Sequence, residues 1–239
     1  MGSANPLFLW LEGVVYLPPA WRIPFHTAIT HVKFVRAEAF HRRGHAYFDL
    51  GQYHRAIGDY DLAIQLKSDH PFAFIDRGVA YSELGQHQRA IQDYDQAIRL
   101  KPDFAVAFHD RGIAYNRLRQ YRRAIEDFSR AIELDPQEPL NYARRGDQYA
   151  ELGQHQPAID DFNRAIQLNP NDPLAYHRRG SQYAELGQDE RAIQDYDEAI
   201  RLEPYDALTY ELRGQARQKL GDQSGAQSDF SKAKALRRK

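Results

Sequence analysis

The sequence predicts an all-α fold, a solenoid in which helix–turn–helix units stack side by side. Glycine follows arginine six times at intervals of 34 residues, and an alanine and an aromatic ring return later in each unit with the same period. A fixed period of this length is typical of stacked helical repeats, in which each unit buries its apolar face against its neighbours. The three series are Gly44, Gly78, Gly112, Gly146, Gly180, Gly214; Ala56, Ala90, Ala124, Ala158, Ala192, Ala226; and Tyr60, Tyr94, Phe128, Phe162, Tyr196, Phe230.

Composition agrees with one elongated array and excludes several chemistries. Of the 239 residues, 42% are hydrophobic and 27% are charged, and the formal net charge of −1 gives no indication of nucleic acid or an anionic membrane as partner. The chain has no cysteine, which excludes thiol catalysis, disulfides and cysteine-ligated zinc. We expect a cytoplasmic protein, although a chain without cysteine is equally compatible with the periplasm.

Residues 1–36 lie outside the repeat and form an apolar N-terminal segment. The run at 7–17 is apolar apart from Glu12, but it is shorter than the about 20 residues that a helix needs to span a bilayer. No Lys or Arg precedes this run, which argues against a secretory signal peptide. From Phe25 onward the apolar spacing is near helical, with Pro24 as a possible first helical residue, although the β-branched residues there suit a strand equally.

Each repeat unit is predicted to contain a first helix, a glycine turn and a second helix. Glycine just past a helix end adopts a positive φ without steric cost, and Arg119 takes its place in the third unit, where it should lower local stability. The last unit carries more polar residues, as expected where a terminal repeat faces water. The six units are residues 37–70, 71–104, 105–138, 139–172, 173–206 and 207–239.

The repeated positions resemble the tetratricopeptide-repeat family over about residues 37–239. In the second unit the family's spacings are met by Phe74, Gly78, Tyr81, Ala90, Tyr94, Ala97 and Pro102. The resemblance implies a right-handed superhelix whose first helices line a concave groove that binds a peptide or a partner protein. Some relatives bind the C-terminal carboxylate of their ligand with lysines and asparagines on this face. This sequence lacks that set, so the resemblance does not extend to that activity.

An arginine and an aspartate recur in step with the glycine. The arginine precedes each glycine, and the aspartate follows sixteen residues later, just before the ring of the second helix. Opposite charges with one period predict a ladder of ion pairs along the solenoid that also bridges neighbouring units. The alternative is that both residues are solvated surface charges. The pairs are Arg43–Asp59, Arg77–Asp93, Arg111–Asp127, Arg145–Asp161, Arg179–Asp195 and Arg213–Asp229.

Helical spacing predicts which residues face the groove, on the side of each first helix away from its paired helix. In the second and third units this face is mostly apolar, and contiguous exposed apolar surface usually marks a binding site. The alternative is that another part of the same chain covers it. The predicted partner-binding residues are Phe72, Ile75, Val79, Val106, His109, Ile113, Asn116, Leu140 and His177, and the same face carries Glu38, His41, His45, Asp49, Ala143, Asp147, Leu174 and Ser181.

No catalytic or metal-binding constellation is recognisable. The carboxylates occupy repeated structural positions, so we expect no enzyme activity and no cofactor. His41 and His45 are four residues apart and share one helix face. Tetrahedral zinc needs three or four convergent ligands, and neither His31 nor His109 is a fixed third one. We therefore interpret the histidines as structural or solvent-exposed and expect no metal.

The sequence favours a non-enzymatic protein-interaction scaffold with a protein or peptide partner. One alternative is a membrane-proximal adaptor in which residues 7–17 lie in a membrane interface. Another is an RNA-binding helical-repeat protein, but Glu38, Asp49 and Asp147 argue against the basic groove that it needs, so we expect no nucleic acid.

Two contacts are expected for the N-terminal segment. Residues 25–36 should cover the open face of the first unit. Residues 7–17 should dock in the groove of the same or a neighbouring molecule, which would allow self-association.

Overall fold

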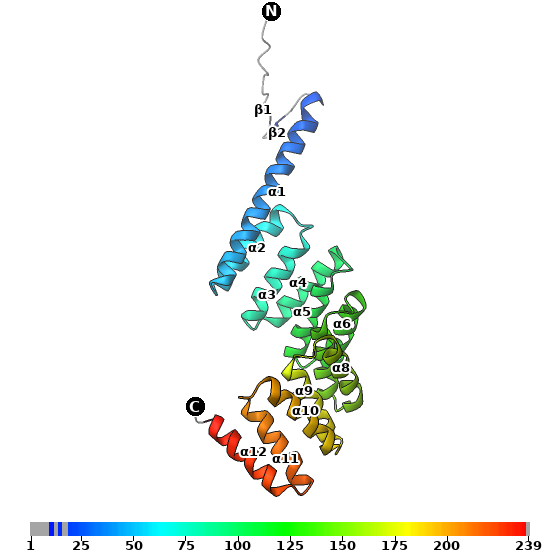
Figure 1. Ribbon diagram of the computed structural model, residues 1–239. Helices are drawn as coiled ribbons and strands as arrows, with labels where there is room; N and C mark the ends of the chain where they lie inside the picture. The colour runs from blue at the N-terminus through cyan, green and yellow to red at the C-terminus, as the bar shows by residue number, and fades with distance from the viewer. Residues whose placement is uncertain (1–9, 12–13, 16–18, 238–239) are drawn as a thin grey trace, which may run out of the picture.

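The computed structural model describes residues 10–11, 14–15 and 19–237, and the side chains of residues 30–237. Within these residues, twelve helices follow one another, and each packs mainly against the helices before and after it. Two short strands, β1 (Trp10–Leu11) and β2 (Val14–Val15), form an antiparallel pair ahead of the helices. The helices stack into one curved array that runs from α1 to α12 (Figure 1).

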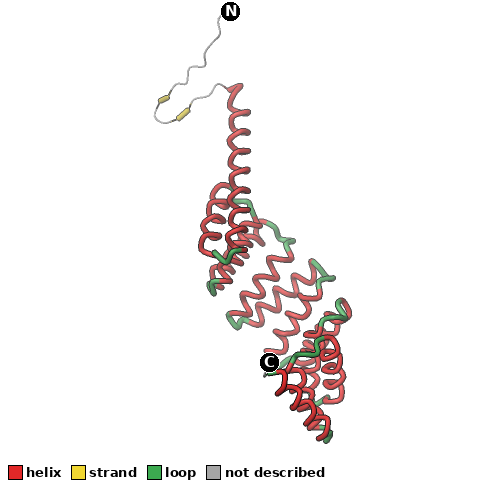
Figure 2. The backbone as a smooth tube through the Cα atoms, turned by 60° about the vertical axis from the view of Figure 1, so that its left-hand side comes forward, coloured by secondary structure: helices red, strands yellow, loops and turns green. Residues whose placement is uncertain are grey.

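The helices pair into six units, numbered as in the sequence, and short loops join them (Figure 2). The first helices are α1 (Pro19–Asp49), α3 (Pro71–Glu83), α5 (Ala105–Arg117), α7 (Pro139–Glu151), α9 (Pro173–Glu185) and α11 (Ala207–Lys219). The second helices are α2 (Tyr53–Leu66), α4 (His87–Leu100), α6 (Tyr121–Leu134), α8 (His155–Leu168), α10 (Asp189–Leu202) and α12 (Gln223–Leu236).

Each unit is closed by contact between the glycine of its first helix and the ring of its second helix. A Cβ placed on Gly44 would lie 2.6 Å from the ring of Tyr60, and one on Gly112 would lie 2.9 Å from Phe128. Glycine in a helix interior costs roughly 1 kcal/mol relative to alanine, and this close crossing explains why it recurs. The rings beneath the glycines form the core: Tyr60, Tyr94, Phe128, Phe162 and Tyr196 are at most 1% exposed.

The arginine–aspartate ladder is confirmed. Arg111 donates from Nε and Nη2 to both carboxylate oxygens of Asp127, at 2.8 and 2.7 Å, and from Nη1 to Asp95 of the preceding unit at 2.5 Å. The predicted bridge between units is therefore present as well. The bridging acceptors of Arg77, Arg145, Arg179 and Arg213 are Asp61, Ser129, Asn163 and Asp197. The ladder sets how one unit sits on the next, and so it positions the surface of the first helices.

The helical alternative for the N-terminal segment is confirmed, but its expected position is wrong. Helix α1 begins before Pro24, runs unbroken to Asp49 and projects beyond α2 (Figure 1). Residues 30–36 are exposed, and burial begins at Ala37. Because α1 continues in one direction, residues 30–36 extend past the first unit. They do not fold back across its open face. The side chains of residues 25–29 lie outside the described residues.

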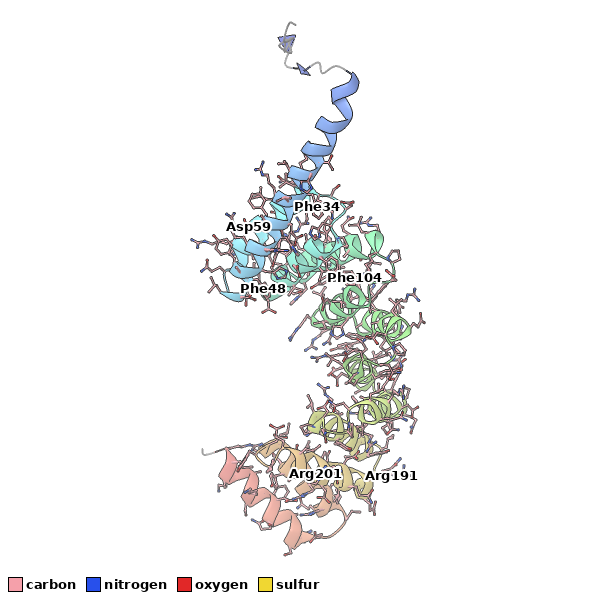
Figure 3. The ribbon with its side chains drawn as sticks, turned by 45° about the horizontal axis from the view of Figure 1, so that its top comes forward. Phe34, Phe48, Asp59, Phe104, Arg191 and Arg201 are labelled. Carbon is pink, nitrogen blue, oxygen red and sulfur yellow. The ribbon has the colours of Figure 1, made fainter. Side chains whose placement is uncertain are left out.

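Exposed apolar residues lie on this projecting part of α1. Val32, Phe34 and Val35 are each about half exposed, and the ring of Phe34 (Figure 3) lies 4.7 Å from Nζ of Lys67. No helix within the described residues combines the length and the apolar character needed to cross a membrane. Most of the run at 7–17 lies outside the described residues, and the predicted docking of that run lies there with it.

The turns between paired helices show why Arg119 is unfavourable. Gly51, Gly85, Gly153 and Gly187 have φ values from 69° to 71° at this turn, and Arg119 is held at φ 56° in the third unit. A left-handed backbone costs a residue with a Cβ on the order of 1 kcal/mol, because the Cβ crowds the following carbonyl.

Replacing Arg119 with glycine should therefore stabilise the protein. We expect Arg119→Gly to raise the free energy of unfolding by about 0.5–1 kcal/mol, after the greater freedom of glycine in the unfolded chain is included. Gly153→Ala, at the equivalent turn, should lower it by about 1 kcal/mol. Urea unfolding followed by circular dichroism measures both, and no change in either variant would contradict the strain at this position.

The ladder gives a second prediction. Asp127 is 5% exposed, and burial raises its pKa while the hydrogen bond from Arg111 lowers it. Removing Arg111 leaves a buried carboxyl without its partner, so Arg111→Ala should destabilise the protein by about 3–5 kcal/mol. The double variant with Asp127→Ala should lose less than the sum of the two single losses. Additive losses below about 1 kcal/mol would place both charges in solvent.

Candidate partner-binding groove

Five apolar side chains form a row on the surface of the first helices. Each is the second residue of its helix, the five recur every 34 residues, and each is between 42% and 50% exposed. An exposed apolar side chain is ordinary when single, but its return at one position in five consecutive units makes a continuous feature. In the first unit, the charged Glu38 takes this position. We call Phe72, Val106, Leu140, Leu174 and Leu208 the apolar row.

The predicted groove residues lie at three depths. Phe72, Val106 and Leu140 belong to the apolar row, and Leu208 is the member that helical spacing had missed although the 34-residue period points to it. Ile75 is 5% exposed and belongs to the core cluster of α3, α4 and α5, so its side chain lies beneath the surface. The others are partly buried: Val79, His109, Ile113, Asn116 and His177.

Two equivalent hollows open beside the apolar row. A hollow of 240 Å³ is lined by Val106, Leu140 and His109, among others. Another, of 270 Å³, is lined by Leu174, Leu208 and His177, which are the corresponding residues two units further on. Each hollow therefore has two members of the row and one histidine in its wall. Two acidic residues also line each hollow, Asp135 and Glu138 in the first and Glu203 and Asp206 in the second, so the repeat builds the same partly apolar recess twice.

The histidine in each hollow is held by the next unit. Nδ1 of His109 lies 2.6 Å from Oδ1 of Asn141, and Nδ1 of His177 lies 2.7 Å from Oγ1 of Thr209. Burial lowers the pKa of both histidines, so both are neutral near pH 7. Apolar side chains beside a neutral histidine and carboxyl groups suit an apolar side chain of a bound peptide together with the N–H groups of its backbone.

The charge of the groove changes along the array. Counting from the first residue of each 34-residue unit, position 9 of one unit meets position 6 of the next. Nε2 of His45 lies 2.9 Å from Oδ2 of Asp76, and Oδ1 of Asp147 lies 3.1 Å from Nε of Arg178. Position 6 is acidic in the second and third units and basic in the fourth and fifth, as Asp76, Asp110, Arg144 and Arg178.

Two of these charged groups lack a partner. Within residues 30–237, no hydrogen bond or ion pair reaches the carboxyl group of Asp110, and burial together with the charge of Asp76 raises its pKa to about 7. Nε of Arg144 is buried and has no hydrogen-bond partner in the same part of the chain. Burial also raises the pKa of Asp147 to about 6, against the charges of Arg178 and Arg144. The middle of the groove therefore keeps polar capacity that the described chain does not use.

Further hollows lie away from the apolar row. One of 470 Å³ is lined by Arg119 and Tyr121 at the turn between α5 and α6, and an equivalent one of 370 Å³ is lined by Gly51 and Tyr53. Their recurrence two units apart identifies them as a product of the turn geometry. They contain no member of the row.

Comparison with known proteins identifies the repeat. A model described as tetratricopeptide repeat matches residues 37–70, 71–104 and 105–138, and one described as TPR repeat matches residues 146–187 and 180–221. No curated protein sequence matches the chain.

Solved structures are similar over most of the array. MamA has 26% sequence identity and a TM-score of 0.65, over 67% of this chain and 94% of that one. YrrB, described as a TPR protein with an unusual peptide-binding site, has 22% identity and a TM-score of 0.65, over 74% and 91%. PilF of Pseudomonas aeruginosa has 17% identity and a TM-score of 0.74, over 85% and 93%, and the last two likenesses concern the fold alone. The predicted fold class, a right-handed superhelical all-α solenoid, is confirmed.

The raised pKa of Asp110 predicts how stability depends on pH. A carboxyl whose folded-state pKa exceeds its unfolded value of about 3.9 stabilises the fold below that value, and this stability is lost as pH rises through about 7. The loss is at most about 1.4 kcal/mol for each unit of pKa. Asp110→Asn should therefore exceed the stability of the wild type by a small margin near pH 5 and by a larger margin near pH 8.

Urea unfolding at the two pH values measures this effect. Asp103→Asn, at an exposed position in the turn just before α5, is the control and should have the same stability as the wild type at both pH values. Equal pH dependence of the wild type and Asp110→Asn would show that the Asp110 carboxyl group ionises normally.

Proposed function

Because the chain belongs to the tetratricopeptide-repeat family, we propose that it is a non-enzymatic scaffold that binds a peptide or partner protein along the apolar row. The observation that carries the proposal is the recurrence of the row in five consecutive units, each member close to half exposed. The proposal takes residues 37–239 as the scaffold and residues 1–36 as a separate segment, and it keeps the cytoplasmic location expected from the sequence.

The apolar row and its hollows would supply most of the affinity. Burying one aliphatic or aromatic side chain contributes about 1.5–3 kcal/mol. Two peptide side chains in the two hollows would therefore supply a substantial part of the binding free energy of a micromolar complex. The binding surface consists of the row with the partly buried residues behind it, without Ile75. These residues are Val79, His109, Ile113, Asn116 and His177.

The charges beside the row would orient the partner. Asp76 and Asp110 lie at the end of the groove nearest α1, and Arg144 and Arg178 lie in the next two units. A partner with a basic group opposite the aspartates and an acidic group opposite the arginines is favoured over the reverse orientation. The free acceptor of Asp110 is the position where a peptide gains a hydrogen bond.

The two alternative functions have less support. An RNA-binding groove needs cations along its length, and Asp76, Asp110 and Asp147 interrupt them. The membrane-proximal adaptor and self-association both rest on residues 7–17, and no observation on the described residues favours them. The partner we propose is therefore a protein or peptide.

A matched pair of surface leucines tests the groove. Leu140 in the row and Leu100 at the end of α4 are each 42% exposed, so either accepts a charge without unfolding the protein. Peptides selected from a random display library on the full-length chain serve as probes. We expect Leu140→Asp and Leu174→Asp to weaken their binding about 10- to 100-fold, measured by fluorescence anisotropy, because a charged group then replaces an apolar side chain of the row in each hollow.

Leu100→Asp should leave the affinity unchanged. Selected peptides that bind all three variants as they bind the wild type would place the binding surface elsewhere and contradict the proposal.

A further inference from the structure

A histidine pair and a carboxylate converge where the first two units meet. Nε2 of His41 lies 2.6 Å from Oδ2 of Asp76, and Nε2 of His45 lies 2.9 Å from the same oxygen. The three ligand-capable atoms lie within 4.8 Å of one another. His41 and His45 come from adjacent turns of α1, and Asp76 comes from α3. Asp76 is the third ligand that the sequence alone did not identify.

The later units show what a purely structural histidine looks like at the position of His41. His109 and His177 occupy it in the third and fifth units, where Asn141 and Thr209 of the following unit hold their Nδ1 atoms. The residue equivalent to Asn141 and Thr209 behind His41 is Ala73, which has no polar side-chain atom. His41 therefore lacks that hydrogen bond and faces a carboxylate instead.

The second histidine also distinguishes the first unit. Ile113 and Ser181 stand at the position of His45 behind His109 and His177, and Val79 stands there in the second unit. At positions 45, 73 and 76 this junction differs from both junctions that carry a structural histidine. The equivalent residues are Ile113, Asn141 and Arg144 beside His109, and Ser181, Thr209 and Leu212 beside His177. If Asp76 were only a solvated charge and His41 only a core histidine, these differences would have no reason to occur together.

The donor set and its accessibility fit a metal ion. Two imidazole nitrogens and one carboxylate oxygen suit a borderline divalent transition metal, whereas Mg²⁺ and Ca²⁺ prefer oxygen ligands. His41 is 8% exposed, while the side chains of Asp76 and His45 are 22% and 48% exposed, so the cluster is anchored on one side and open on the other. We propose that His41, His45 and Asp76 bind a divalent transition-metal ion, with Zn²⁺ as the best chemical match and water as the fourth ligand.

The required rearrangement is small. Ligands of tetrahedral zinc at about 2.0–2.1 Å from the ion lie about 3.3 Å from one another, compared with the present 2.6 and 2.9 Å. Spreading the three ligand atoms by about half an ångström makes room for the ion. His45, as the most exposed of the three, supplies most of that movement.

A second group of side chains shares His41 but fits an ion less well. Glu38 and His70 lie on the other side of His41, with Nε2 of His70 3.7 Å from Oε2 of Glu38. Glu38 already accepts a hydrogen bond from Arg42 at 3.1 Å, and its carboxylate oxygen is farther from the imidazole of His70 than Asp76 is from either His41 or His45. We assign the ion to Asp76 and place Glu38 and His70 outside its coordination sphere.

An ion at this position would join α1 to α3. It would therefore tie the long first helix to the second unit, at the end of the groove that carries the acidic position-6 residues. Because a divalent ion outweighs the single charge of Asp76, metal binding would also change the net charge of that end from negative to positive.

Zinc titration of the full-length chain, freed of any histidine tag, tests the proposal. Isothermal titration calorimetry with Zn²⁺ should give one site per chain, and Zn²⁺ should raise the melting temperature. Co²⁺ should give the ligand-field absorption band of a tetrahedral nitrogen–oxygen site. His45→Val, which installs the residue of the second unit, and Asp76→Asn should each lower the Zn²⁺ affinity at least about 10-fold.

Three histidine controls separate this site from general histidine binding. His54→Gln on the exposed face of α2 and His109→Gln in the third unit should leave the affinity within about threefold, and so should His70→Gln. Absence of a one-to-one site, or equal losses in His54→Gln or His109→Gln, would overturn the proposal. A loss in His70→Gln as large as that in His45→Val would overturn the assignment to Asp76. Circular dichroism in the presence of a chelator establishes that each variant is folded.

Discussion

The contact of each first-helix glycine with the ring beneath it is the constraint on which the rest of the structure depends. A Cβ at these glycines would lie within 2.6–3.0 Å of a ring of the paired helix, so only glycine permits this separation of the two helices. The short separation brings the arginine next to the glycine within reach of the aspartate next to the ring. The ladder, the stacking of units and the apolar row all follow from that spacing.

Apolar packing and the charge ladder have different roles. Rings and alanines remove area from water, which supplies the driving force for folding. The ladder aspartates are buried, and their desolvation offsets much of the attraction to arginine, so the pairs contribute less net stability than their short distances suggest. The ladder instead fixes the position of each unit relative to the next. Nη1 of Arg111 donates to Asp95 of the preceding unit, and this hydrogen bond forms in only one placement of the two units.

The proposed partner and metal sites depend on where the units differ from one another. The junction of the first two units has histidines facing a carboxylate, while the next has Val79 and an unpartnered Asp110. Further on, Asp147 pairs with Arg178. The row beside these junctions remains apolar in five units. A constant apolar surface with a changing polar border can hold one class of ligand firmly and still select its orientation and sequence.

The sequence by itself determined the class of fold, the places of the turns and the ladder, because all three depend on spacings within one unit. Arginine and aspartate sixteen residues apart meet inside a single helix pair, and Arg119 is unfavourable for a reason local to its turn. Four of the features that matter for the groove depend on how units or helices are placed relative to one another. Ile75 is buried because the third unit packs near it, and Asp76 reaches His41 and His45 from the next unit. Helix α1 passes the first unit rather than covering it, and Asp110 is left without a partner. Helical periodicity assigns a residue to one face of a helix, but the rotation between units decides what that face meets, and only the tertiary structure contains that rotation.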